Sequence, residues 1–234
     1  MRTSIRRFAS QLLVLAMCPF AVQAIPVTYS FSTGNPIAVG DPTLVPLFSG
    51  LTVNGTFEYD SAATGTTGTV PAGFPTTGAT IYFNSTANLS GSVGTNSFSD
   101  ALGRTIVGND VFGGINDFLA LNADPLIGSP APPSEFGFIG FDIAGFTLVN
   151  VRMFWIENLI AGAPDFLPDQ NLPGALPGLV GRLALDFTPT ASPGALSPVF
   201  FDGLTVTRVP EPTTLSLLAL GLLGLAFRRR PHST

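Results

Sequence analysis

The side chains with the clearest potential for chemistry lie in a loop toward the C-terminal end of the chain. Asp165, Asp169 and Asn171 bring carboxylate and amide oxygens together in a short stretch, and oxygens of this type are what hard Ca²⁺ prefers. Asn109–Asp110 and Asn116–Asp117 form a second grouping of the same kind. Neither matches the EF-hand spacing, and Asp and Asn also hydrogen-bond their own backbone in loops. We expect turn chemistry at both, with Asp165, Asp169 and Asn171 as secondary candidates for a Ca²⁺ site.

Most catalytic chemistry is excluded by missing residue types. All ten basic residues are arginines, the single cysteine is Cys18, and the single histidine is His232, close to the C-terminus. Between those two positions the chain cannot build a Ser-His-Asp triad, a histidine-ligated zinc site, a thiol nucleophile or a Schiff base. A glycosidase needs only two carboxylates, so it remains a distant alternative, although no pair stands out. We therefore expect a protein that is not an enzyme and has no resident cofactor.

The charge of the chain is unevenly distributed. Residues 25–209 contain four arginines and fourteen carboxylates, a net charge of −10, whereas the whole chain has −5 because the other six arginines lie near the termini. An acidic surface of this kind repels nucleic acid and anionic lipid. We expect no nucleic-acid partner.

The middle of the chain has the pattern of strands and turns. Period-two alternation of apolar and polar residues extends over 80–93, 179–187 and 51–59. In 51–59 the alternation keeps its phase through Asn54-Gly55, which predicts a continuous strand there rather than a hairpin. In 80–93 it predicts one largely apolar face formed by Ile81, Phe83, Ser85, Ala87, Leu89, Gly91 and Val93.

Further strands are expected over 27–31, 118–122, 136–143, 146–154 and 203–208. Residues 151–161 are ambiguous, because Val151, Trp155 and Leu159 also recur at helical spacing; we favour a strand for the first half. Gly, Pro, Ser and Thr dominate 64–78, 128–134, 163–178 and 188–198, which predicts long loops. Many short strands without a long amphipathic helix favour an all-β domain over residues 25–208. We expect a single antiparallel β-sandwich, jelly-roll-like or immunoglobulin-like, plus one C-terminal hydrophobic helix.

The two ends of the chain have the features of export signals. Arg2, Arg6 and Arg7 precede an apolar run from Leu12 to Val22, and Val22-Gln23-Ala24 suits a signal peptidase. We expect residues 1–24 to be a signal peptide, cleaved between Ala24 and Ile25. A lipoprotein reading at Cys18 is the alternative, but Met17 is too large for the position before the cysteine.

The C-terminal segment has three parts in a fixed order. Val209-Pro210-Glu211-Pro212 is followed by an uncharged apolar stretch over 213–227, and then by Arg228, Arg229 and Arg230. A helix of that length covers only about 22 Å, less than the roughly 30 Å hydrocarbon core. The arginines favour the cytoplasmic side and act as a topological stop, while the two prolines keep the junction extended and accessible.

This segment, residues 209–230, resembles the PEP-CTERM sorting signal of Gram-negative bacteria. The same tail is also labelled an ice-binding protein C-terminal domain, a name that says nothing about the rest of the chain. The resemblance implies a transient membrane tether through the helix, then cleavage at or near Pro210-Glu211-Pro212 by exosortase, a membrane transpeptidase. The released protein would reach the cell surface or an exopolysaccharide-rich matrix. An ordinary single-pass anchor that is never cut is the alternative.

These observations together predict an exported structural protein of the cell surface or of an extracellular biofilm matrix. Signal peptidase and exosortase would process it, and the exopolysaccharide matrix would surround it. The main alternative is a carbohydrate-binding or adhesive module, with or without the help of bound Ca²⁺. In that module Trp155, Tyr29, Tyr59 and Tyr82 would form a platform on which sugar rings stack. Aromatic residues in strands are more often part of a core, so we expect the structural role.

Overall fold

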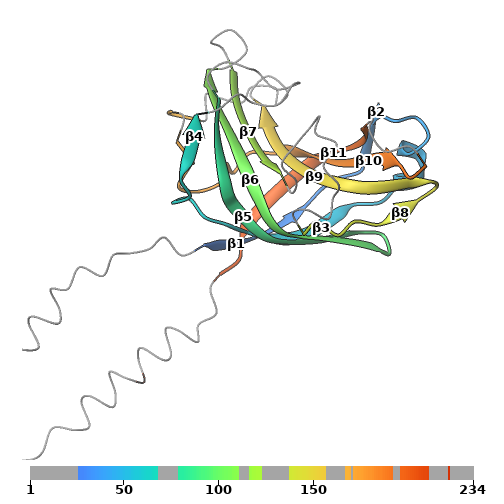
Figure 1. Cartoon of the computed structure of the whole chain (residues 1–234), viewed down its shortest axis with the longest axis horizontal. Helices are drawn as coiled ribbons and strands as arrows, with labels where there is room; N and C mark the ends of the chain where they lie inside the picture. Colours follow the sequence, from blue (N-terminus) through green and yellow to red (C-terminus); the bar gives the residue numbers. More distant parts are fainter. Residues whose placement is uncertain are drawn as a thin grey trace, which may run out of the picture.

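The strands of this protein form one antiparallel sheet that closes on itself (Figure 1). The computed structural model describes residues 26–67, 79–110, 116–122, 137–156, 167–169, 171–191, 196–210 and 221. The strands are β1 (Val27–Ser32), β2 (Pro36–Gly40), β3 (Val53–Tyr59), β4 (Gly65–Thr67), β5 (Ala79–Val93), β6 (Asn96–Asp110), β7 (Asn116–Asn122), β8 (Asp142–Ile143), β9 (Phe146–Ile156), β10 (Gly181–Pro189) and β11 (Ser197–Arg208). A short 3-10 helix, η1 (Val45–Phe48), lies between β2 and β3.

Closure of the sheet corrects the expected β-sandwich. Hydrogen-bonded neighbours follow the order β1-β3-β5-β6-β7-β9-β10-β11, and β11 pairs back with β1 from Tyr29↔Arg208 to Ser32↔Thr205. The result is a closed antiparallel barrel of eight strands. Alternating strands of this length suit a sandwich and a barrel equally well, and the pairing of the first strand with the last decides between them. Because the sheet closes, β1 and β11 pair with each other, and neither is left as an unpaired edge strand there.

The barrel interior is filled by large apolar side chains. Trp155, Tyr59, Phe57, Phe187 and Phe201 are among the largest fully buried residues, and they come from β9, β3, β10 and β11. An eight-stranded barrel is just wide enough for its inward side chains to meet across the middle. The core of the described domain is therefore the inside of the barrel.

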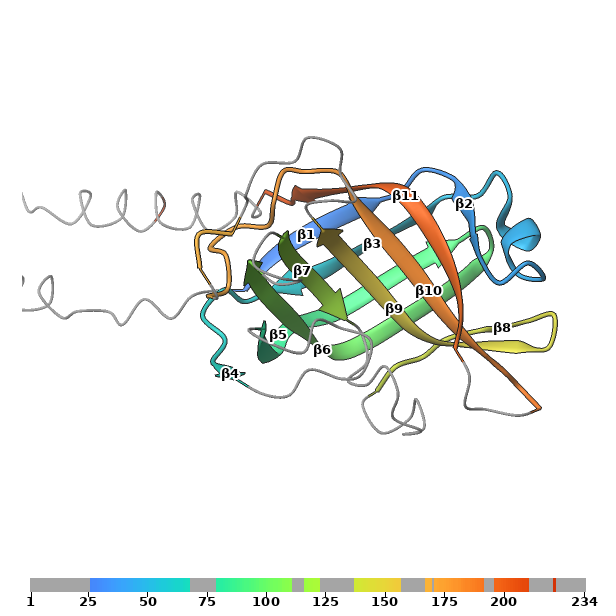
Figure 2. The ribbon, with the colours of Figure 1, turned by 90° about the horizontal axis from the view of Figure 1, so that it is seen from above.

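Two short segments close the ends of the barrel (Figure 2). At one end η1 inserts Phe48, whose ring lies 5.6 Å from Phe187 and 6.1 Å from Phe201. At the other end the coil that precedes β10 places Leu167, Leu172 and Leu176 in the core. This coil is held by two buried polar groups: Trp155 Nε1 donates to Leu179 O (3.0 Å), and Tyr59 Oη donates to Pro173 O (2.8 Å).

Several expected strands are confirmed. β3 runs without interruption through Asn54-Gly55, with Val53, Phe57 and Tyr59 buried and Asn54 and Thr56 exposed. β10 has its expected inward face, including Leu183, Leu185 and Phe187. The ambiguous stretch after Val151 is strand as far as Ile156, and residues 157–161 lie outside the described part of the chain.

The single apolar face expected for β5 was wrong. The ladder with β6 shifts register between Phe83 and Thr86, and Asn84 and Asn88 have positive φ angles of 55° and 50°. Asn tolerates this left-handed conformation better than most residues. The irregularity puts Phe83 on the surface with half of its side chain exposed, while Leu89 farther along is buried in the core.

Strand β6 was not predicted from the sequence, although it is as long as β5. Its alternation is obscured because polar residues occupy buried positions, such as Asp100 and Thr105, and Leu102 is exposed. β4 falls inside the loop expected over 64–78, and β11 begins earlier than the expected residue 203. The strand expected over 136–143 is reduced to the bridge Ser99↔Ile139 and to β8, and residue 136 lies outside the described ranges.

A second apolar cluster lies on the outer side of the barrel wall. It contains Ala79, Ile81, Ile106, Phe118 and Ala120, which alternate with the inward residues of β5, β6 and β7. This outer cluster explains why the apolar pattern of these strands is nearly continuous, since both faces are buried there.

All described strands and all core residues lie between Val27 and Arg208. Residues 25–209, which we call the barrel fragment, therefore contain every core residue that the structure describes and the β1–β11 ladder that closes the barrel. This stretch has what an independent folding unit needs.

Candidate functional site

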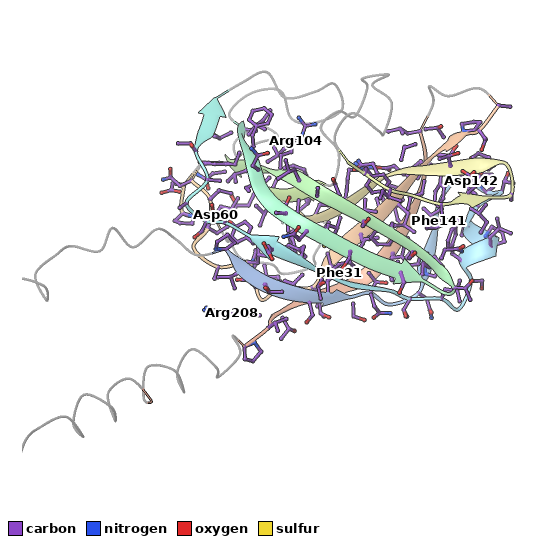
Figure 3. All side chains as sticks on the ribbon, turned by 60° about the horizontal axis from the view of Figure 1, so that its bottom comes forward. Phe31, Asp60, Arg104, Phe141, Asp142 and Arg208 are labelled. Atoms are coloured by element: carbon purple, nitrogen blue, oxygen red, sulfur yellow. The ribbon has the colours of Figure 1, made fainter. Side chains whose placement is uncertain are left out.

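The first and last strands bring the two ends of the barrel fragment together. Val209 N donates to Thr28 O (2.9 Å), one residue beyond the pair Tyr29↔Arg208. Figure 3 shows Arg208 at the end of β11, beside the start of β1. The expected sorting motif therefore begins at the wall of the barrel, with Val209 as its first residue and Pro210 next.

Most residues of the two expected signals lie outside the described part of the chain. This applies to Ala24 and Ile25 at the expected signal-peptide cleavage, to Glu211 and Pro212 in the sorting motif, and to Arg228, Arg229 and Arg230. It also applies to the apolar helix expected over 213–227, apart from Gly221, which is helical. Among the residues that the structure does describe, no helix combines the length and the apolar character needed to cross a membrane.

The structure rules out the sugar-stacking platform that the aromatic residues suggested. Trp155, Tyr29, Tyr59 and Tyr82 expose 0%, 6%, 2% and 7% of their surface, and all four belong to the core cluster inside the barrel. Burial raises the pKa of Tyr59 far above its ordinary value of 10.0, and burial also raises the pKa of Tyr82. These side chains stabilise the barrel and present no face to a ligand.

Asp169 and Asn171 form a turn, and Asp117 acts as a tether. Asp169 accepts hydrogen bonds from the backbone N–H of Asn171 to Oδ1 and from Asn171 Nδ2 to Oδ2, both at 2.8 Å. Asp117 is buried and accepts from Leu167 N (2.6 Å), which ties the capping coil to β7. Asp165 lies outside the described ranges. In the described residues, no three or more His, Cys, Asp or Glu side chains gather as metal ligands would.

A turn at the opposite end of the barrel uses the same chemistry. Asp41 Oδ1 accepts from Thr43 N (2.8 Å), and this backbone hydrogen bond is the main reason that the pKa of Asp41 is lowered from its ordinary value.

Two ion pairs on β9, β10 and β11 use two of the four arginines in the barrel fragment, one in a buried pair and one in a partly exposed pair. Arg152 holds the fully buried Asp186 through two bonds, Nε–Oδ2 at 2.6 Å and Nη2–Oδ1 at 2.7 Å, and Asn150 Nδ2 adds a third at 3.1 Å. Arg182 Nε meets Asp202 Oδ1 at 2.5 Å in a partly exposed pair. The buried charge of Asp186 needs such a partner, so the contact with Arg152 has a structural role.

Sequence reasoning missed a polar surface on β11, β1, β3, β5 and β6. Outward residues of these strands are in register across the sheet in two neighbouring rows, Thr207-Ser30-Thr56-Ser90-Ser99 and Thr205-Ser32-Asn54-Ser92-Ser97. We call these ten residues the hydroxyl face. Nine of them carry a hydroxyl group, one carries an amide, and none is charged. The signal was present as short Ser/Thr alternation within single strands, but its alignment depends on strand order.

The hydroxyl face is exposed and cross-linked by its own side chains. Ser32 Oγ donates to Asn54 Oδ1 (2.7 Å), and Thr56 Oγ1 lies 3.2 Å from Ser90 Oγ. Ser30 and Ser99 are partly buried, and the other eight residues are exposed. Hydroxyl pairs across strands stabilise a sheet modestly, and each hydroxyl keeps further hydrogen-bonding capacity for a ligand or for water.

Comparison with known families assigns the C-terminal segment. The described residues form an acidic, closed barrel, and the C-terminal segment begins directly after its last strand. Residues 208–230 match the family model described as the PEP-CTERM protein-sorting motif. This motif marks a protein that is exported and sorted by exosortase, and such proteins are associated with the cell surface in Gram-negative bacteria. No curated protein and no solved structure matched the chain.

Proposed function

We propose that this protein is a non-enzymatic structural component of the cell surface or of an exopolysaccharide-rich biofilm matrix. Signal peptidase would remove residues 1–24, the C-terminal helix would tether the protein transiently, and exosortase would cut near Pro210–Pro212. The barrel fragment would then be the part that acts outside the cell.

The observation that carries this proposal is the position of the sorting motif. Val209 is hydrogen-bonded to Thr28, so the motif follows the last strand without a linker. A cut near Pro210–Pro212 would release the whole barrel and leave its closing ladder intact. The composition of the released part agrees with an extracellular role, because its net charge of −10 maintains solubility.

The structural role is supported by how the potential chemical groups are used. The aromatic residues fill the core, Asp186 is neutralised by Arg152, and Asp169 closes its own turn. Each of these groups has a role in stability, which favours a scaffold over a catalyst.

Mass spectrometry of surface material from the native host tests the sorting step. We expect a mature protein without the residues before Ile25 and without any peptide from 215–227. Replacing Arg228, Arg229 and Arg230 with Glu should remove the topological stop and prevent processing, whereas replacement with Lys keeps the positive charge and serves as the matched control. Recovery of the intact tail from the surface fraction, or normal processing of the Glu variant, would show that the tail is a plain anchor.

A further inference from the structure

The hydroxyl face has the chemistry of a ligand-binding surface. On a fragment with fourteen carboxylates, its ten positions carry no charge, and neither row is interrupted by an apolar side chain. Glu58 is the nearest charged residue along β3, two positions beyond Thr56. An acidic protein that presents a neutral patch of this size can approach an uncharged partner without the repulsion that an acidic partner would meet.

The face also has a usable shape. A shallow open groove of about 630 Å³ runs over β3, β5 and β6, between the two rows. Gly55 and Gly91 contribute to its lining, so backbone is accessible between rows of short side chains. Ile139, two-thirds exposed, stands at its edge.

The spacing of the polar groups is regular because the sheet sets it. Neighbouring strands lie about 4.8 Å apart, and residues two positions apart in one strand are separated by about 6.7 Å. Each hydroxyl both donates and accepts hydrogen bonds. A ligand that matches this array must itself carry many neutral hydroxyl groups at short, repeated intervals.

We propose that the hydroxyl face binds an uncharged polysaccharide chain through side-by-side hydrogen bonds. This inference rests on the proposed location of the protein in an exopolysaccharide matrix, and it names the matrix component and the surface that meets it. Because none of the ten residues of the hydroxyl face has an aromatic ring on which a sugar could stack, each sugar unit binds weakly. Binding therefore depends on many units engaging at once, and a polymer binds where a monosaccharide does not.

Co-sedimentation or affinity electrophoresis of the barrel fragment with insoluble cellulose, amylopectin and dextran tests the proposal, with the polyuronate alginate as the charged comparison. We expect retention by at least one of the three uncharged polymers, no retention by alginate, and no competition from free glucose. Because the barrel fragment is used, the result is independent of export and processing. Failure here would leave the sorting test unaffected.

The variant T56V/S90A removes a facing hydroxyl pair from the middle of one row and should lower the bound fraction at least tenfold. Its matched control, S49A/T190V, makes the same two changes at exposed positions away from the face, where Thr190 Oγ1 lies 3.1 Å from Thr147 Oγ1. The control should bind as the unmodified fragment does. Circular dichroism and unfolding midpoints verify that both variants are folded.

Three results would overturn the proposal. The first is retention by none of the uncharged polymers, and the second is equal binding by T56V/S90A and the unmodified fragment. The third is a change in oligomeric state of T56V/S90A, measured by light scattering, without a change in polymer binding, which would identify the face as a contact between copies of this chain.

Discussion

Phe31 lies opposite Gly55 across the β1–β3 ladder, and its ring occupies the space in which a side chain at position 55 would stand. The same row continues to Gly91 and Phe98, so two glycines in neighbouring strands are each covered by an aromatic ring from the strand beside them. Glycines covered in this way allow a sheet to bend strongly. This row lies inside the barrel, directly beneath the groove of the hydroxyl face.

Gly55→Ala should destabilise the barrel by about 3 kcal/mol, because overpacking a closed core and crowding the backbone both oppose the added methyl group. Its Cβ would lie 2.5 Å from Phe31 Cζ and closer still to Ser90 O. Urea unfolding of the barrel fragment measures this change. Gly174→Ala is the matched control, since nothing lies within 4 Å of its added atom, and it should change stability by less than about 1 kcal/mol. Equal midpoints for the two variants would contradict the assigned role of Phe31.

The breaking of the Arg152–Asp186 pair should be costly. Asp186 is fully buried and accepts both bonds from Arg152, so Arg152→Ala leaves a buried carboxylate with only Asn150, at a cost of about 3–5 kcal/mol. The double variant R152A/D186A should lose much less than the sum of the two single variants, because it removes both charges. Chemical denaturation of the four proteins provides this double-mutant cycle.

Arg182→Ala is the comparison for that cycle. Its partner Asp202 is partly exposed, and an exposed ion pair is worth about 1 kcal/mol or less. If Arg182→Ala and Arg152→Ala prove equally destabilising, burial of Asp186 is not what makes its ion pair important.

Strands with a regular alternation of apolar and polar residues were predicted correctly from the sequence, and irregular strands were not. β3 and β10 alternate cleanly and were predicted with the correct inward faces, whereas β6 was missed because Asp100 and Thr105 occupy buried positions. In β5 the left-handed backbone of Asn84 shifts the alternation of inward and outward residues partway along the strand. The residue pattern of the strand alone does not show this shift. Closure into a barrel depends on Tyr29 meeting Arg208, a pairing between opposite ends of the sequence.

Functional residues could likewise be predicted only where they are contiguous in the sequence. The terminal motif is a contiguous string from Val209 onward and was identified directly, and its match over 208–230 confirms it. The hydroxyl face could not be predicted, because its rows exist only once five strands are placed in register. The burial of Trp155, by contrast, follows the general preference of strand aromatics for the core.

The barrel fragment should lose stability as the pH rises above about 10. Burial raises the pKa of Tyr59 in the folded protein above its ordinary value of 10.0, so the unfolded chain releases this proton first and stability falls with increasing pH. The slope approaches about 1.4 kcal/mol per pH unit for one such group. With no lysine, cysteine or histidine in residues 25–209, tyrosines dominate this titration.

Urea midpoints measured between about pH 8 and about pH 11 test the alkaline loss, since tyrosine ionises over this range. Tyr59→Phe should flatten the dependence, although it starts from a lower stability by about 1–3 kcal/mol because Pro173 O loses its donor. A Tyr59→Phe variant whose slope matches that of the unmodified fragment would show that Tyr59 is not the responsible group.

Trp155 should behave as a reporter of folding and not as a ligand contact. It is the single tryptophan, it is fully buried, and Nε1 donates to Leu179 O. We expect blue-shifted emission that is shielded from iodide, a red shift on unfolding, and no change on adding saturating cellulose or dextran oligosaccharides. Ready quenching by iodide in the folded fragment would place the indole at the surface and contradict the core described above.

Pairing of the first strand with the last has a consequence during secretion. In a chain that crosses the membrane from its N-terminus, β1 emerges long before β11. The hydrogen-bond partner of Ser30 in β1 lies 177 residues later in the chain. Until Thr205–Arg208 arrives, one edge of β1 is open to other chains, and contacts of such long sequence separation form slowly. The sorting motif begins directly after β11, so a chain held at the membrane through this segment would keep the two edges near each other while the barrel closes. The tail would then delay release until the barrel can no longer aggregate through that edge.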